Sequence, residues 1–190
     1  MQREEYIDTL KKRFTKNGFL IVDGGHMGGH ELIFSASKDN SVWWLPGNEG
    51  AFFFVTEIDS PDINILKRFS SDCSHYAYSS LKKGFLKKPF PPFVLSYSIA
   101  ITDQVDSLLV KVLDKTQPLT RWGTYVLEYP IVVIPETGQL FYPPHRIVKD
   151  GHFHTLDGSM YYDQTPDYID YMLSPANSEI RQWPPKRSKS

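Results

Sequence analysis

The chain has 190 residues, of which 41% are hydrophobic and 14% aromatic, and its formal net charge is −1. This length fits one domain with a substantial apolar core that needs no metal or disulfide to fold, and the balanced charge excludes a strong long-range attraction for nucleic acid. The charged N-terminal segment and the lack of an apolar run of about 20 residues predict a protein that is neither secreted nor inserted in a membrane.

A helix, a strand and a glycine-rich loop are predicted at the N-terminal end. A tyrosine, a leucine and a phenylalanine recur every four residues over residues 3–16, and an Asn-Gly pair follows them, which predicts a helix. The continuous apolar run at residues 19–22 predicts a short buried strand. Four glycines lie within residues 24–29, and because glycine loses the most entropy on ordering, this segment is expected to be the most flexible inside the domain.

Three strands and a long helix are expected next. Residues 32–36, 42–45 and 51–58 are apolar runs separated by turn-rich clusters, and such short connections predict an antiparallel meander. Ser60, followed by proline and aspartate, predicts the start of a helix over residues 61–83, because a hydroxyl cap and a proline both suit the first helical turn.

The central part of the chain predicts two further strands around a helix. Residues 93–102 alternate large apolar with small side chains, which is the clearest period-two pattern in the sequence. Asp103 is expected to cap a helix over residues 104–115. Residues 121–142 predict a core hairpin, in which Pro130 implies an edge position or a bulge because it cannot donate a ladder hydrogen bond.

We therefore expect an α+β fold: a mostly antiparallel, or mixed, sheet of about six strands packed against two to three helices, with a peripheral C-terminal hairpin and short helix. Residues 1–144 would form a single core domain. Residues 145–175 would add a hairpin around an Asp-Gly turn and a helix that begins at a Thr-Pro-Asp sequence, both packed on the core. Residues 176–190 would form a flexible basic tail.

Histidines suggest weak candidates for a metal site. His26 and His30 flank the glycine-rich segment, with Glu31 beside them, and His152 and His154 have the spacing that places two rings on one strand face. The order of histidines and glutamate differs from the helical zinc-protease motif, and the glycines argue against a helix there. Exposed loop histidines without a metal are the favoured interpretation.

Acidic residues in apolar strands are weak candidates for catalytic groups. Glu57, Asp59 and Glu128 lie within or directly after predicted strands, as in metal-dependent nucleases, but the acid-spacer-acid-x-lysine pattern of those enzymes is missing. A buried carboxylate would need a partner. Strand alternation favours a Glu128 side chain that faces solvent.

Other chemistry has little support. Phenylalanines interleave with lysines between Lys82 and Phe93, which allows a nucleic-acid strip, but a helix end followed by a core-packing connector explains the same pattern. Cys73 is the single cysteine, so an intrachain disulfide is excluded, a reducing compartment is expected, and the residue is interpreted as part of the core.

The function expected from these patterns is a non-catalytic protein-binding or regulatory domain in the cytoplasm, without a cofactor, whose partner is another protein or a second copy. The aromatic residues that favour protein contacts are Trp43, Trp44, Trp122, Tyr161 and Tyr162. The alternative is a metal-dependent hydrolase or nuclease in which a divalent metal ion binds His26, His30 and Glu31, with Glu57 or Glu128 behind them. Nucleic-acid binding is the less favoured third hypothesis, and no membrane contact is expected.

Overall fold

The computed structural model describes residues 1–39, 49–84, 93–115, 119–121, 126–143, 165–177 and 180. Its elements in chain order are α1 (Arg3–Lys16), β1 (Leu20–Asp23), β2 (His26–Met27), β3 (His30–Asp39), β4 (Glu49–Glu57), α2 (Ile63–Gly84), β5 (Phe93–Ile101), α3 (Ser107–Lys115), β6 (Leu119–Arg121), β7 (Val126–Ile134), β8 (Gln139–Phe141) and α5 (Thr165–Leu173). The predicted α+β class is confirmed.

The strands form one mixed sheet in the order β1-β3-β4-β5-β7-β6, with β2 paired to β3 and β8 paired to β7. Among the described residues the sheet therefore has eight strands, counting the short β2, compared with the expected number of about six. β3 and β4 pair directly with one another and are antiparallel, whereas the predicted meander would have placed a strand at residues 42–45 between them. β4, β5 and β7 run parallel to one another. Parallel neighbours need a crossover connection, and α2 supplies it between β4 and β5.

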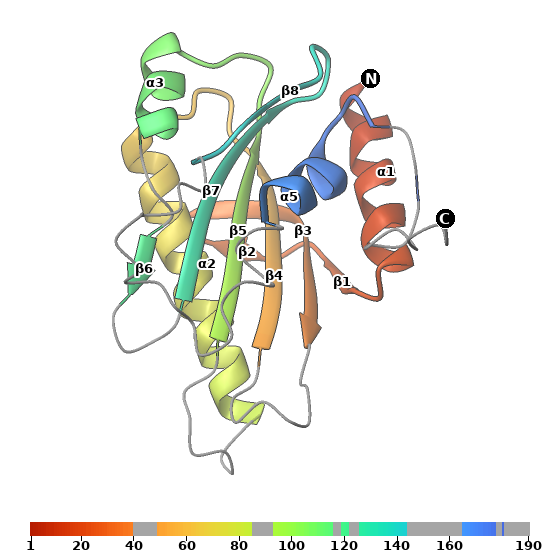
Figure 1. Ribbon diagram of the computed structural model, residues 1–190, viewed down its shortest axis with the longest axis vertical. Helices are drawn as coiled ribbons and strands as arrows, with labels where there is room; N and C mark the ends of the chain where they lie inside the picture. The colour runs from red at the N-terminus through yellow and green to blue at the C-terminus, as the bar shows by residue number, and fades with distance from the viewer. Residues whose placement is uncertain are drawn as a thin grey trace, which may run out of the picture.

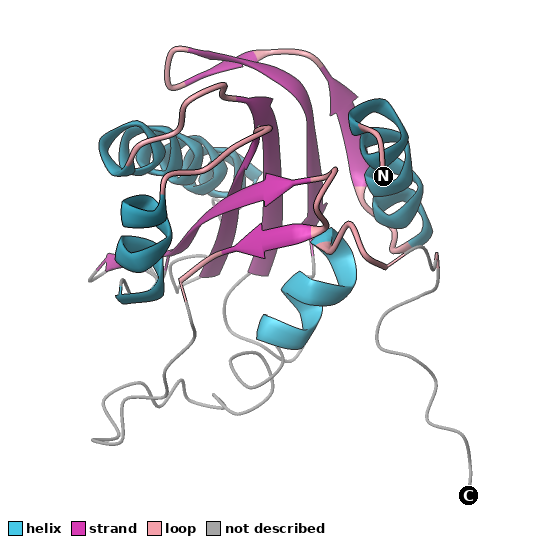
Figure 2. Cartoon of the chain, turned by 90° about the horizontal axis from the view of Figure 1, so that it is seen from above, coloured by secondary structure: helices cyan, strands magenta, loops and turns pink. Residues whose placement is uncertain are grey.

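Helices cover both faces of the sheet. Figure 1 shows α2 behind the sheet and α5 in front of it, and Figure 2 shows the same layers from above, with α1 beside the strands on the side opposite α2. Side-chain alternation along β5 separates the two halves of the core: Tyr97 and Ile99 pack with α1 and α5, whereas Val94 packs with α2. Both faces are buried, so every residue of β7 is buried.

Side chains of α1 hold the C-terminal end of α5. The Tyr6 hydroxyl donates a hydrogen bond to the Leu173 carbonyl oxygen at 2.6 Å. The Arg13 guanidinium donates to the carbonyl oxygens of Met172 and Ser174, at 3.1 and 3.0 Å. The carbonyls of Met172 and Leu173 belong to the last turn of α5 and that of Ser174 follows directly, so no intrahelical donor is available to them. Burial lowers the pKa of Arg13, and the neighbouring tyrosines partly offset this effect.

Two sequence predictions about the strands are wrong, one on the burial of β1 and one on the position of Pro130 in the sheet. β1 is not buried: it is the terminal strand of the sheet, and Leu20 and Val22 are exposed. Pro130 lies on neither an edge strand nor a bulge, because β7 has neighbours on both sides. On the side away from β5, however, β6 pairs with residues 126–128 and β8 with residues 132–134, so Pro130 falls between them, where no ladder donor is required.

The helix caps also differ from the prediction by a few residues. The Asp62 carboxylate accepts hydrogen bonds from the backbone N–H groups of Asn64 and Ile65, so Asp62, rather than Ser60, caps α2. In the same way Asp106, rather than Asp103, lies before α3 and accepts from the N–H of Leu108. Both caps are aspartates close to the expected positions, and the helices begin at residues 63 and 107 instead of 61 and 104.

Several predictions fall outside the described residues: the strand at 42–45, the connector at 85–92, the hairpin after residue 145 and most of the basic tail. The helix predicted from Thr165 is confirmed as α5. Among the helices that the structure describes, none combines the length and hydropathy required to cross a bilayer.

Candidate functional site

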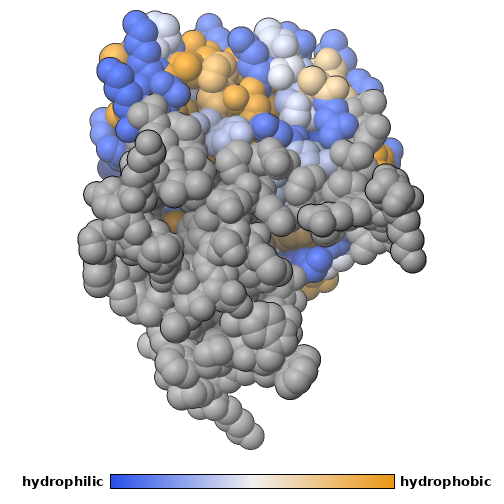
Figure 3. Space-filling model, in the orientation of Figure 1, coloured by the Kyte–Doolittle hydropathy of each residue, from blue (hydrophilic) through white to orange (hydrophobic). Residues whose placement is uncertain are grey.

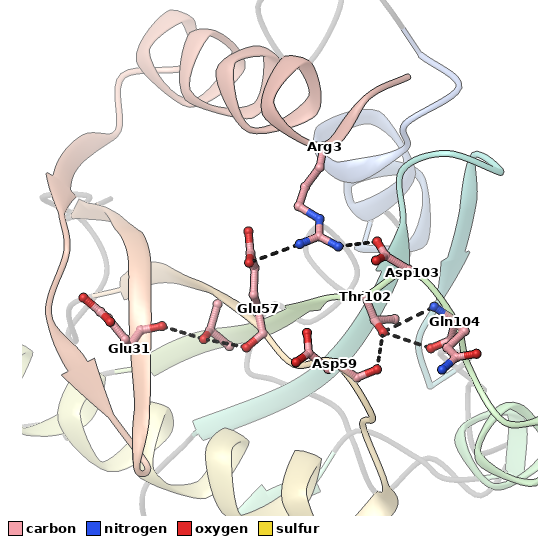
Figure 4. A network of polar contacts seen from close by, with 8 residues as sticks. Arg3, Glu31, Glu57, Asp59, Thr102, Asp103 and Gln104 are labelled. Carbon is pink, nitrogen blue, oxygen red and sulfur yellow. Dashed lines mark hydrogen bonds and ion pairs between the residues drawn. The ribbon is translucent and has the colours of Figure 1, made fainter.

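A polar network lies where β4 and β5 end (Figure 4). Because these strands are parallel neighbours, their carboxyl ends meet at one edge of the sheet, and Glu57 and Asp103 come together there. The Arg3 guanidinium donates to Glu57 Oε2 at 3.2 Å and also to Asp103 Oδ1, so one cation bridges the two acids. The hydrogen bond with Asp103 is the main reason that the pKa of Arg3 is raised, and Glu57 and Asp59 add to the effect.

Backbone contacts support this edge. Thr102 Oγ1 lies 3.2 Å from the carbonyl oxygen of Asp59 and 2.9 Å from that of Gln104, and it can donate to either. The Thr56 hydroxyl donates to the carbonyl oxygen of Glu31 at 2.6 Å. Figure 4 shows the Glu31 carboxylate pointing away from the network. The arrangement gives an acidic, exposed edge that Arg3 partly neutralises.

Glu128 lies on the other face of the sheet. It is fully buried on β7, beneath α2, and its Oε1 accepts a hydrogen bond from the Ser74 hydroxyl at 2.6 Å. The prediction of a solvent-facing Glu128 is therefore wrong. The alternation was assigned correctly, but both faces of the strand are covered. Glu57 faces the α1 side and Glu128 faces α2, so the sheet separates the two candidate acids.

The glycine-rich segment is a regular hairpin rather than a flexible loop. β2 pairs with β3, and Gly28 and Gly29 form the two-residue turn between them, with φ of 59° and 81°. Positive φ at both positions matches the turn type that suits the twist of hairpin strands. The His30 ring lies 5.6 Å from the Phe69 ring of α2, in an edge-to-face contact, whereas His26 is exposed. The hairpin therefore packs against α2.

The described residues include no group of three or more histidine, cysteine, aspartate or glutamate side chains suited to hold a metal ion. Glu31 lies opposite His26 in the hairpin, but Glu57 is paired with Arg3 and Glu128 lies under α2. His152 and His154 lie outside the described residues.

Asp103 belongs to this acidic network, although the sequence predicts a different role for it. It was expected to cap a helix, and instead it joins Glu57 through Arg3. The long helical connection between residues 58 and 93 was the available signal, because a helix between two strands favours a parallel pair whose carboxyl ends meet.

Cys73 is buried in the hydrophobic cluster between α2 and the sheet. Burial is the main reason that the pKa of its thiol is raised. A nucleophilic cysteine requires the opposite shift, so the structure agrees with a core role. The lysine and phenylalanine side chains between Lys82 and Phe93, and the aromatic residues Trp43, Trp44, Trp122, Tyr161 and Tyr162, lie outside the part of the chain whose side chains are described.

An apolar area lies on the surface between α3 and β8, which contact one another. Leu108 on α3 is 64% exposed. Three half-buried apolar side chains come from the same region: Val105, two residues before α3, Val112 on α3 and Phe141 on β8. Figure 3 shows hydrophobic side chains gathered beside α3 and along β8, with hydrophilic residues around them. We call Val105, Leu108, Val112 and Phe141 the α3–β8 patch.

Comparison of the chain with models of protein families, with curated proteins and with solved structures gives no match.

Proposed function

We propose that this protein is a cytoplasmic, non-catalytic binding module that contacts another protein through the α3–β8 patch. The observation that carries the proposal is the exposure of Leu108 among half-buried apolar neighbours on two contacting elements. An apolar centre with a polar rim is the arrangement found at the core of protein interfaces. The exposed charges of Asp106, Lys111 and Asp114 supply such a rim.

The environments of the candidate catalytic groups also support a non-catalytic role. Glu57 is held by Arg3, Glu128 is buried against Ser74, and Cys73 is a core residue. Each of these groups is therefore engaged in a contact or a cluster of the fold itself. The buried, single cysteine agrees with the reducing environment of the cytoplasm.

Burial of one leucine side chain contributes about 1.5–3 kcal/mol, which corresponds to an affinity change of at least about tenfold. Leu108→Ser should therefore weaken binding by about tenfold or more. Ile180→Ser is the control, because Ile180 is another exposed aliphatic residue, at 43% against 64%, and it belongs to neither α3 nor β8.

The partner is first captured with a photo-crosslinking amino acid at Lys111, one turn from Leu108. It is then purified and titrated against the wild-type chain and each of the two variants. We expect the Leu108 variant to lose affinity while its thermal unfolding temperature stays within about 2 °C of the wild type, since exposed positions have small effects on stability. Equal affinities for the Leu108 and Ile180 variants, or no discrete crosslinked partner at Lys111, would refute the proposal.

A further inference from the structure

We propose that β1 pairs with β1 of a second copy of this chain, antiparallel and related by a two-fold axis. This inference goes beyond the proposed function, since it concerns another surface and another partner. β1 is the terminal strand of the sheet and, among the described strands, pairs with β3 alone. An edge strand presents backbone donors and acceptors that a second strand can use.

The side chains of β1 fit this pairing. Leu20 and Val22 are 68% and 55% exposed, and strand alternation places both on the same face, while Ile21 between them packs toward the core with α1. In a two-fold pairing centred on Ile21, Leu20 of one copy lies opposite Val22 of the other. Each apolar side chain then covers an apolar side chain of the second copy, and the two-fold axis makes this contact twice.

The neighbouring strands extend the same face. Val22 and Leu20 lie opposite Ser35 and Ser37 of β3, and these serines lie opposite phenylalanines of β4. Tyr76 of α2, which is 53% exposed, reaches this face with its ring 5.9 Å from that of Phe54. The exposed apolar side chains at this end of the sheet therefore share one face, and a second copy would continue it.

Charge on α1 favours a second copy over an unrelated partner. α1 adjoins β1, as the 2.7 Å ion pair between Lys11 and Asp23 shows, and both ribbon views place it alongside this end of the sheet (Figures 1 and 2). Its exposed acids lie in the first half and its exposed lysines in the second half; they are Glu4, Glu5, Asp8, Lys12 and Lys16. A two-fold axis perpendicular to the sheet reverses the helix direction, so the acidic half of one α1 faces the basic half of the other. A net charge of −1 adds little repulsion.

The test is sedimentation analysis of the full chain over about 1 µM to 1 mM, a range that covers weak self-association. We expect a monomer–dimer equilibrium that Val22→Lys weakens by at least about tenfold. Leu108→Lys, at a site on α3 that is 64% exposed against 55% for Val22, should leave the dimer unchanged. A wild-type chain that stays monomeric throughout, or dimerises equally well with Val22→Lys, would overturn the proposal.

A charge exchange tests the two-fold geometry separately. Lys12→Glu with Lys16→Glu makes the exposed charged residues in both halves of α1 acidic and should weaken the dimer. Added Glu4→Lys with Glu5→Lys should restore it, because the two halves then have opposite charges again. Oxidation of a Leu20→Cys, Val22→Cys chain should give a covalent dimer, since residues that face one another in an antiparallel pair approach the Cβ separation of about 3.5–4.5 Å that a disulfide requires. The buried Cys73 does not compete. Failure of the charge exchange to restore association would refute the two-fold arrangement.

Discussion

The hydroxyl of Tyr6 offers a clean test of how α1 holds α5. Tyr6→Phe removes one oxygen atom and leaves the ring, which is fully buried, in place. The substitution deletes the 2.6 Å hydrogen bond to the Leu173 carbonyl and leaves that oxygen without its side-chain donor at a helix end. Tyr76→Phe is the matched control, because the Tyr76 side chain is 53% exposed and its hydroxyl can reach water.

The expected loss follows from the burial of this bond. A buried acceptor that loses its partner costs about 1–3 kcal/mol, compared with a few tenths for an exposed hydroxyl. For a chain of this size, each kcal/mol lowers the unfolding temperature by roughly 2–4 °C. Thermal and urea unfolding should therefore show a clear shift for Tyr6→Phe, and amide exchange should be faster in residues 165–173. Equal stability of the two variants would contradict the assigned hydrogen bond.

Alkaline pH provides a second measurement on the same variant. Burial raises the pKa of Tyr6 above its ordinary value of 10.0, so the unfolded phenol ionises first as pH rises. The contribution of Tyr6 is therefore complete below about pH 10 and is lost above it, at up to about 1.4 kcal/mol per pH unit. The stability of Tyr6→Phe should fall less steeply above pH 10. Parallel curves for the variant and the wild type would refute this linkage.

Three further experiments test the α2 side of the core. Ser74→Ala removes the donor to the buried Glu128 carboxyl group and should lower the free energy of unfolding in urea by about 1–3 kcal/mol. Ser79→Ala, on the exposed face of α2, is the control and should have almost no effect. Equal effects of the two substitutions would contradict the buried contact. Gly28→Ala should destabilise the fold more than Gly29→Ala, although both positions have positive φ. A Cβ at residue 28 would lie 3.1 Å from atoms of α2, whereas one at residue 29 meets nothing within 4 Å. Thermal unfolding gives the ranking of the two variants, and the reverse order would refute this reasoning. Cys73 should react with a thiol reagent only at the rate of unfolding, since burial raises its pKa and excludes the reagent; fast labelling of the folded chain would show that this core position is open.

Local periodicity was enough to predict the elements that have one regular pattern. The four-residue spacing of Tyr6, Leu10 and Phe14 predicts α1 with the bounds that the structure shows, and the alternation at residues 93–102 predicts β5 to within one residue. The hairpin of β7 and β8 is confirmed as well. In each case the signal lies within the segment itself, so no knowledge of the neighbours is required.

The position of Glu128 needed information that the strand does not contain. Alternation shows which residues share a face, but whether that face is exposed to solvent depends on α2, which lies about 50 residues earlier in the chain. The same limit applies to β1, whose apolar run at residues 19–22 resembles a buried strand but lies at the end of the sheet order. The pairing of Glu57 with Asp103 likewise follows from a parallel arrangement of β4 and β5 that only the tertiary fold reveals.

The contact between α1 and α5 has a consequence for synthesis on the ribosome. Arg13 and the carbonyl that it binds at Met172 are 159 residues apart, and at 5–20 residues per second this separation takes roughly 10–30 s to translate. During that interval the nascent α1 has no α5 to cover its guanidinium and its aromatic rings. A chaperone that shields this helix until translation reaches residue 173 would raise the yield of native protein.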